Sequence, residues 1–226
     1  MLKAIIFDFN GVISDDEPIH LSSMLRVLEE EGIKVPLDEY HTKYLGRDDR
    51  DCFRLAFAEV GRSIGPEMML SLVQRKSVYY RQSIQRELRV FPGVVPFIEQ
   101  AYHHHYELAV ASGALRSEIE FVLNSLGLRD RFRCVASSHE IDRGKPEPDI
   151  FLKTLEDLNL VREGGTILPT HCLVIEDSLA GIKAALSAGM KCLAVTNTYP
   201  AESLAEAHYV VASLDISLES LQALFP

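Results

Sequence analysis

Short apolar runs alternate with helical patterns along most of this chain. The first run, 4–9, is continuous and stops at Asn10-Gly11, which favours a strand buried on both faces of a parallel sheet over a helix. Similar runs predict further strands at 108–111, 134–136, 173–175, 193–195 and 209–211. Helical patterns lie between them at 94–103, 116–126, 148–158 and, after a capping Ser178, 179–186. Alternation of this kind predicts an α/β fold with a doubly wound parallel sheet.

Residues 17–89 show no good strand pattern. Apolar positions between residues 21 and 28 are spaced as one face of a helix that Gly32 would end. Further helices are predicted at 37–44, 50–59 and 66–82. We therefore expect a core made of 1–16 and 90–226, with an all-helical domain, 17–89, inserted after the first strand.

The composition is that of a globular protein and narrows the range of partners. The chain has 226 residues, of which 47% are hydrophobic, enough to fill a core. Its formal net charge of −10 argues against a nucleic-acid or anionic-membrane surface, because both depend on clustered Lys and Arg. The sequence shows no signal-like segment and no membrane span, so the expected location is the cytoplasm. No obligate protein partner is predicted.

Cysteine and histidine residues do not form an obvious metal site. The four cysteines are scattered, with no pair at metal-ligand spacing, and are interpreted as reduced core residues: Cys52, Cys134, Cys172 and Cys192. The run His103-His104-His105 is interpreted as a solvated loop, because adjacent side chains point in different directions and seldom bind one ion.

Polar side chains follow the first four strands of the predicted sheet. They are Asp8 and Asn10 after the first, Ser112 after the second, Lys145 in the loop after the third, and Glu176-Asp177 after the fourth. In a parallel sheet these positions meet at one edge, where ligands bind. Clustered carboxylates resist ionisation unless a cation lies among them, and magnesium (Mg2+) prefers such oxygen ligands. The sequence thus predicts a magnesium and phosphate site, although Asp8 taken alone could also be an ordinary turn aspartate.

A carboxylate in such a site can itself be the nucleophile. It would form an aspartyl-phosphate, which divides phosphoryl transfer into two easier steps, and Asp8 is placed for that role.

Four segments in register resemble the haloacid dehalogenase superfamily, specifically its phosphatase and β-phosphoglucomutase-like branch with a helical cap. They are Phe7-Asp8-Phe9-Asn10-Gly11-Val12 through Asp15, Ala111-Ser112-Gly113, Gly144-Lys145-Pro146-Glu147-Pro148-Asp149-Ile150-Phe151, and Ile175-Glu176-Asp177-Ser178 with Gly181-Ile182 and Ala188-Gly189-Met190. Their order, spacing and chemistry agree over nearly the whole chain. The resemblance implies a magnesium-dependent hydrolase that acts on a small phosphorylated metabolite.

The resemblance also implies a role for each matching residue. Asp8 would be the nucleophile and a metal ligand. The backbone carbonyl of Asn10 and the carboxylate of Asp177 would complete the metal ligands, with Glu176 in support. The phosphoryl group would be held by Ser112, Gly113 and Lys145.

The inserted domain adds candidates for substrate contact. Residues 45–50 resemble the cap loop that, in this branch, contacts the non-phosphoryl part of the substrate, which makes Arg47 and Arg50 candidates. The alternative is a helix start with Asp48 as its cap and solvated arginines. Glu17 is a further candidate for substrate contact, or else an acidic residue favoured by the helix dipole.

Asn10 departs from the family pattern. In the family's phosphatases and mutases this position holds an aspartate, which protonates the leaving oxygen and then activates water or the incoming hydroxyl. An amide has no titratable proton, so Asn10 cannot supply general acid–base catalysis, typically worth about 10²- to 10⁴-fold in rate.

Several interpretations of Asn10 stay open. In the first, the chain is a phosphohydrolase that uses Glu17, Asp16 or His20 instead, or whose substrates have leaving groups that need no proton. In the second, it is a regulatory protein that binds a phosphorylated metabolite. In the third, Asn10 is an introduced substitution. A β-phosphoglucomutase-like mutase is the closest enzymatic alternative, since it uses the same nucleophile. Asn-Gly pairs also deamidate readily in flexible chains, which here would restore the aspartate.

Overall fold

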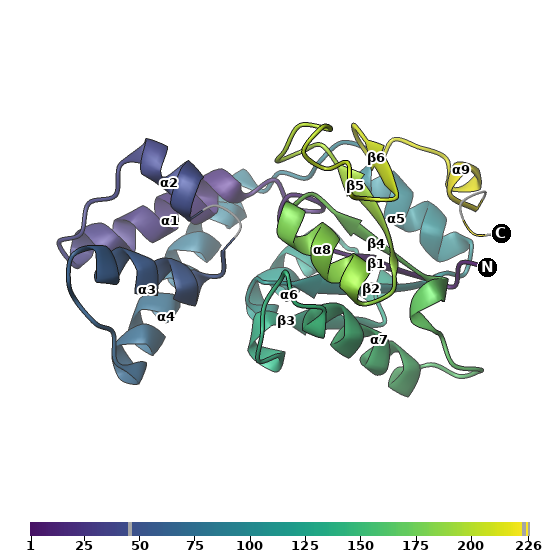
Figure 1. Ribbon diagram of the computed structural model, residues 1–226, viewed down its shortest axis with the longest axis horizontal. Helices are drawn as coiled ribbons and strands as arrows, with labels where there is room; N and C mark the ends of the chain where they lie inside the picture. The colour runs from purple at the N-terminus through teal and green to yellow at the C-terminus, as the bar shows by residue number, and fades with distance from the viewer. Residues whose placement is uncertain (45–46, 223–224, 226) are drawn as a thin grey trace. The chain divides into compact units, whose positions relative to one another are not determined.

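The computed structural model describes residues 1–44, 47–222 and 225, which form two compact units (Figure 1). One unit consists of Met1–Asp15 and Val90–Pro226, and the other of Asp16–Arg89. The first contains the sheet, whereas the elements described in the second are all helices. Leu45 and Gly46 of the predicted cap loop lie outside the described residues.

The sheet has six strands in the order β3-β2-β1-β4-β5-β6, and every neighbouring pair is parallel. The strands are β1 (Ala4–Phe7), β2 (Glu107–Ser112), β3 (Cys134–Ser137), β4 (Cys172–Glu176), β5 (Lys191–Val195) and β6 (Tyr209–Val211). The predicted doubly wound parallel sheet is confirmed. The strand order reverses at β1, which pairs with β2 on one side and β4 on the other. Such a switch point is where ligands bind in open α/β sheets.

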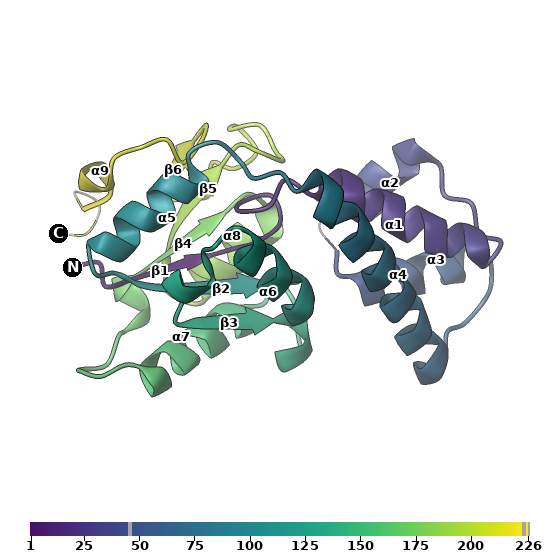
Figure 2. The same ribbon diagram turned by 180° about the vertical axis from the view of Figure 1, so that it is seen from behind.

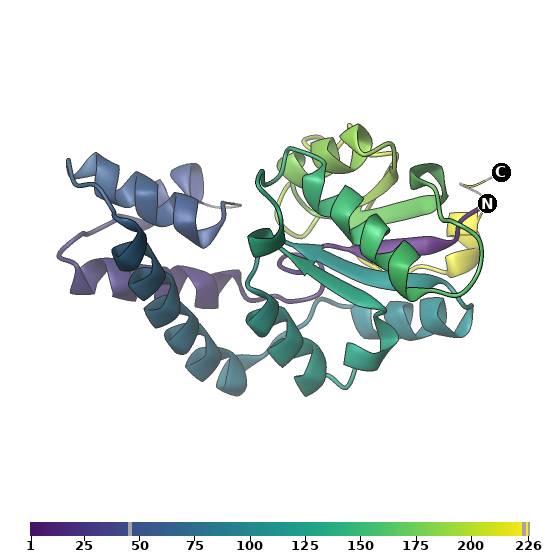
Figure 3. The same cartoon turned by 90° about the horizontal axis from the view of Figure 1, so that it is seen from below.

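Helices cover both faces of the sheet, which lies between them when seen from below (Figure 3). They are α5 (Val94–His103), α6 (Arg116–Ser125), α7 (Asp149–Val161) and α8 (Leu179–Ser187). On one face, Ile6 belongs to a buried cluster with Phe151 of α7 and Ile182 of α8. On the other face, which Figure 2 shows with α5 in front, the Phe7 ring meets the Phe97 and Phe132 rings edge to face, with centroids 6.0 and 5.7 Å apart. Because both faces of β1 are buried, its sequence is a continuous apolar run.

The described residues of the second unit form four helices. They are α1 (Glu17–Glu30), α2 (Leu37–Lys43), α3 (Asp49–Glu59) and α4 (Pro66–Glu87). α1 and α4 pack against each other through apolar positions such as Val27 and Tyr80, which are fully buried. Asp48 caps α3 by accepting a hydrogen bond from the Asp51 backbone N–H at 2.9 Å, as the alternative interpretation of this segment expects.

Element ends differ from the predictions where the chain turns or where no helix-ending residue is present. β1 ends at Phe7 rather than residue 9, because the Phe9 carbonyl instead accepts hydrogen bonds from the N–H groups of Ile13 and Ser14 in a tight turn. α4 continues past residue 82 to Glu87, since no glycine or proline follows before Pro92. α7 extends to Val161, and α9 (Leu218–Gln222) was not predicted.

All four cysteines are free thiols, in agreement with the sequence interpretation. Cys52, Cys172 and Cys192 are buried, and Cys134 is half-buried. None of the helices in the described part of the chain combines the length and the apolar character that a membrane span requires.

Replacing Phe7 by leucine should destabilise the core unit. The smaller side chain loses both edge-to-face ring contacts at a fully buried position, so we expect the free energy of unfolding to fall by about 1–3 kcal/mol in urea titrations. As a control, Leu160→Ala changes a side chain that is 75% exposed. This variant should change the free energy of unfolding by no more than about 0.5 kcal/mol. Equal effects of the two variants would contradict this account of β1.

Candidate active site

Three carboxylates meet at the switch point of the sheet. Asp8 follows β1, whereas Glu176 ends β4 and Asp177 follows it; one carboxylate oxygen from each lies within 4.8 Å of the other two. All three are buried, with at most 7% of each residue exposed. The Asp8 N–H donates to the Ile175 carbonyl at 2.9 Å, which continues the ladder between β1 and β4 and fixes where Asp8 lies. The predicted convergence of these residues is therefore observed.

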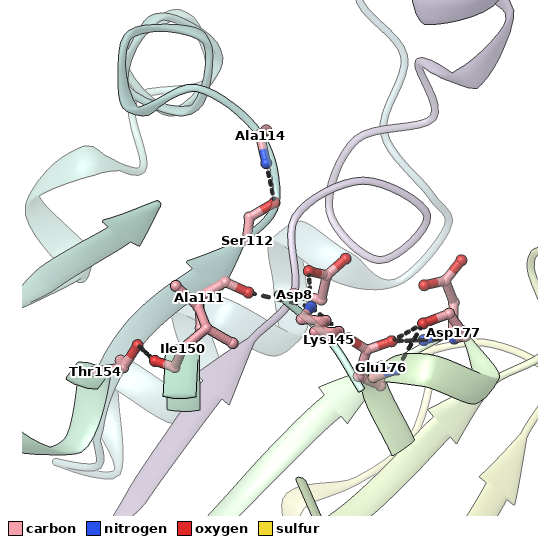
Figure 4. Close-up of polar contacts among 11 residues, drawn as sticks. Asp8, Ala111, Ser112, Ala114, Lys145, Ile150, Thr154, Glu176 and Asp177 are labelled. Carbon is pink, nitrogen blue, oxygen red and sulfur yellow. Dashed lines mark hydrogen bonds and ion pairs between the residues drawn. The ribbon is translucent and has the colours of Figure 1, made fainter. Parts of the chain in front are cut away.

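Lys145 joins two of these carboxylates (Figure 4). Its ammonium Nζ lies 2.5 Å from Asp8 Oδ1 and 2.6 Å from Glu176 Oε1, and 3.5 Å from the Ala111 carbonyl oxygen at the end of β2. The side chain of Lys145 is 15% exposed. A nearly buried ammonium between two carboxylates holds both in place through charge-assisted hydrogen bonds.

Glu176 uses both of its carboxylate oxygens within the chain. Oε1 accepts from Lys145, and Oε2 accepts from the Asp177 N–H, the Ser178 N–H and the Ser178 hydroxyl, at 2.9–3.0 Å. A Cβ atom at position 181 would lie 1.9 Å from this carboxylate, so only glycine leaves room for it. The geometry gives Glu176 the role of fixing Lys145.

The electrostatics of the cluster favour a bound cation. Burial raises the pKa of Asp8 to about 7, although Lys145 opposes the shift. Burial, together with the charges of Glu176 and Asp8, raises the pKa of Asp177 well above its usual value. Burial alone would lower the pKa of Lys145, but Asp8 and Glu176 outweigh it and raise the pKa. Because one ammonium cannot balance three buried carboxylates, a divalent cation with a preference for oxygen ligands fits the residues present.

A tight turn that includes Asn10 and Gly11 packs against the same site. The Gly11 N–H donates to the Ser14 carbonyl at 3.0 Å, and Gly11 has a φ of 77°. A Cβ atom on Gly11 would lie 2.0 Å from Asp177 Oδ2, so the turn packs directly on the Asp177 carboxylate. Glycine is therefore required at position 11 both by its backbone conformation and by this contact.

The residues expected to hold a phosphoryl group lie at the end of β2. Ser112 is buried, and its hydroxyl accepts a hydrogen bond from the Ala114 N–H at 3.1 Å (Figure 4). Gly113 is exposed. β2 neighbours β1, with Val110 opposite Phe7, so Ser112 lies at the same edge of the sheet as Asp8.

Two polar residues that the sequence analysis did not single out complete this edge. The Thr198 hydroxyl donates to Asp177 Oδ2, and Asn197 Nδ2 donates to the Gly11 carbonyl at 2.7 Å. Both follow β5, which is the strand next to β4. They lie two and three residues beyond the apolar run of β5, but nothing in the sequence distinguishes them from other turn residues.

Candidates in the helical unit have partners of their own. The Glu17 carboxylate accepts from the Tyr40 hydroxyl at 2.9 Å, and burial raises its pKa. Arg47 is exposed, and its Nε donates to the Lys43 carbonyl at 2.7 Å. Arg50 is exposed as well. Arg47 and Arg50 thus lie at the surface of this unit, whereas Glu17 is partly buried.

Asp16 and His20 belong to a buried polar network inside the helical unit. Asp16 is fully buried, accepts from the Tyr80 hydroxyl, and lies 3.5 Å from His20 Nε2. His20 Nδ1 is 2.6 Å from Nζ of the buried Lys76, which in turn is 3.1 Å from Asp49. Such a network stabilises the packing of α1 against α4. The charges of His20 and Asp16 also act on Glu17, whose pKa is raised chiefly by burial.

The histidine run lies at the opposite edge of the sheet. His103, His104 and His105 are exposed, as expected for a solvated loop. His104 and His105 line a surface pocket with Lys3, which directly precedes β1, so the pocket is at the edge where the strands begin. Asp8, by contrast, lies where they end.

Known proteins resemble this chain over most of its length. Residues 5–195 match the family described as haloacid dehalogenase-like hydrolase. The chain is 28% identical over 190 residues to a phosphorylated carbohydrates phosphatase of Thermotoga maritima, covering 84% of this chain and 83% of that protein. It is also 28% identical over 204 residues to a β-phosphoglucomutase of Bacillus subtilis, covering 88% and 85%. The crystal structure of a β-phosphoglucomutase from Clostridium difficile superposes with a TM-score of 0.87 at 25% identity, over 100% of this chain and 97% of that one.

Removing the Asp8 carboxylate should flatten the pH dependence of stability in metal-free protein. With its pKa raised from 3.8 to about 7, Asp8 retains a proton in the native state that the unfolded chain has lost. Raising the pH from the unfolded pKa of 3.8 to beyond the native pKa of about 7 therefore lowers the free energy of unfolding, by up to roughly 4 kcal/mol. Urea unfolding in EDTA should show this decrease for the wild type and a smaller one for Asp8→Asn. Asp130→Asn, at an exposed carboxylate, is the control; equal slopes for wild type and Asp8→Asn would show that Asp8 is already ionised.

Asn10 should resist deamidation in the folded protein. The reaction begins when the Gly11 nitrogen attacks the Asn10 side chain, but here that N–H is held by the Ser14 carbonyl. We expect the intact mass and the mass of the peptide containing Asn10 to stay constant on storage, whereas protein kept in urea should deamidate at this pair. A mass gain in the folded sample at the same rate would contradict the protection inferred from the turn.

Proposed function

The chain belongs to the haloacid dehalogenase-like hydrolase family, and we propose that it hydrolyses a small phosphomonoester through an aspartyl-phosphate on Asp8, with Mg2+. The observation that carries this proposal is the buried lysine bridge, in which Lys145 contacts both Asp8 and Glu176. It holds a carboxylate beside a fixed positive charge at the edge of the sheet where ligands bind.

Asp8 is proposed as the nucleophile. One of its carboxylate oxygens forms a bond to phosphorus while the bond from phosphorus to the ester oxygen breaks; water then attacks the aspartyl-phosphate, releasing inorganic phosphate and restoring the carboxylate. Lys145 binds Oδ1, which orients the carboxylate and favours its ionised form. Ser112 and the adjacent Gly113 are proposed to hold the phosphoryl oxygens.

Magnesium is proposed as the cation because its preferred ligands are those present. Asp8, Asp177 and the backbone carbonyl of Asn10 would hold it, and when bound it would supply positive charge facing the phosphoryl oxygens. Glu176 would support the metal only through Lys145 and the backbone around Asp177, since both of its oxygens already accept hydrogen bonds.

Glu17 is proposed to move the proton that Asn10 cannot. Its pKa is raised by burial, so its carboxyl group retains a proton to a higher pH than an exposed glutamate does. The Tyr40 hydroxyl fixes one of its oxygens. Asp16 and His20, the other candidates, are engaged in the network around Lys76.

We assign the helical unit the role of a cap that selects among substrates. The exposed Arg47 is the candidate for contact with the non-phosphoryl part of a small phosphorylated metabolite, together with Arg50.

A reducing compartment such as the cytoplasm is consistent with four free cysteines.

Phosphate release from a panel of sugar phosphates and other small phosphomonoesters tests this function. We expect magnesium-dependent release by the wild type, loss to background in Asp8→Asn, and a decrease of about 10²- to 10⁴-fold in Glu17→Gln. Asn10→Asp should stay within about tenfold of the wild type, because the proton already has a donor. Circular dichroism shows whether each variant is folded.

Other outcomes identify the alternative functions. Release by Asn10→Asp alone would mean that the natural chain binds phosphorylated metabolites without turning them over. A sugar phosphate that changes position without releasing phosphate, followed by phosphorus NMR, would indicate a mutase, as the similarity to β-phosphoglucomutases also allows. Full turnover by Asp8→Asn would exclude the proposed nucleophile.

A further inference from the structure

Thr198 engages one particular oxygen of the Asp177 carboxylate. The Thr198 hydroxyl donates to Oδ2, and the same oxygen faces Gly11, where an added Cβ would lie 2.0 Å from Oδ2 but 3.1 Å from Oδ1. Asp177 is only 6% exposed. Oδ2 is therefore the oxygen that carries the Thr198 hydrogen bond and lies nearer to the Gly11 turn.

The segment that carries Thr198 is itself fixed at two points. The Thr196 N–H donates to the Val211 carbonyl at 3.0 Å, which continues the pairing of β5 with β6. Asn197 Nδ2 donates to the Gly11 carbonyl at 2.7 Å. Because the two residues before it are held, the Thr198 hydroxyl is fixed where it meets Oδ2, and the carboxylate cannot turn without losing this hydrogen bond.

We propose that Thr198 is a positioning residue that restricts Asp177 to a single ligand oxygen, Oδ1, and so makes the site select Mg2+ over Ca2+. Mg2+ requires near-octahedral coordination and binds through a few single carboxylate oxygens with water, whereas Ca2+ accepts six to eight ligands, including carboxylates that bind through both oxygens. A hydroxyl bound to Oδ2 uses one lone pair of this oxygen and fixes the plane of the carboxylate, which disfavours the two-oxygen binding that only the larger ion would use. This inference rests on the proposed function, because it assumes that the acidic cluster binds the metal.

Calorimetric titration of the EDTA-stripped protein with Mg2+ and with Ca2+ tests the proposal without measuring activity. Thr198→Val removes the hydroxyl while keeping the branched shape, and Thr198→Ser keeps the hydroxyl as the matched control. We expect wild type and Thr198→Ser to bind Mg2+ more tightly than Ca2+. In Thr198→Val the Kd for Mg2+ should rise about tenfold or more, as for other residues that orient a metal ligand, while the Kd for Ca2+ stays level or falls.

The outcomes separate this inference from the proposed function. If Thr198→Val keeps the wild-type ratio of the two Kd values, Thr198 does not set the metal preference, although the metal site stands. If the wild type binds neither ion, both the inference and the magnesium part of the proposed function are wrong. Thr198→Ala removes the same hydroxyl with less bulk and should change the ratio in the same direction, and thermal melting in EDTA verifies that each variant is folded.

Discussion

The contact of Lys145 with Asp8 and Glu176 is the interaction on which the candidate site depends. Three buried carboxylates at one sheet edge repel one another, and a single ammonium in their midst offsets part of that repulsion. The same ammonium sets the orientation of Asp8, while backbone N–H groups hold the far oxygen of Glu176. The charge that remains unbalanced favours a bound cation at this site.

The sequence predicted the parts of the site that follow long apolar runs. β1 and β4 are buried on both faces, so their ends are visible in the sequence and locate Asp8, Glu176 and Asp177. Thr198 could not be chosen in the same way, because a threonine after a strand looks like any other turn residue until its hydroxyl is seen on Asp177. The network of Asp16 with Tyr80 joins positions 64 residues apart, and no local pattern predicts such a pair.

Two glycines show how closely the carboxylates are packed. The space that a Cβ atom would fill at position 181 is taken by Glu176, and at position 11 by Asp177. Each glycine thus acts through the absence of a side chain, because the missing atoms leave room for a buried carboxylate against the backbone. This close packing also explains why both acids are almost fully withdrawn from solvent.

The central place of β1 in the sheet has a consequence for how the chain folds as it is synthesised. β1 leaves the ribosome before either of its partners, which follow only after the helical segment, and Lys145 lies 137 positions beyond Asp8. An apolar strand that must be covered on both sides therefore waits, unpaired, while the intervening helices can form from local contacts. The inserted helical segment delays the synthesis of β2 and β4 relative to β1. The apolar β1 strand of the newly made chain is therefore exposed to aggregation until β4 has been synthesised.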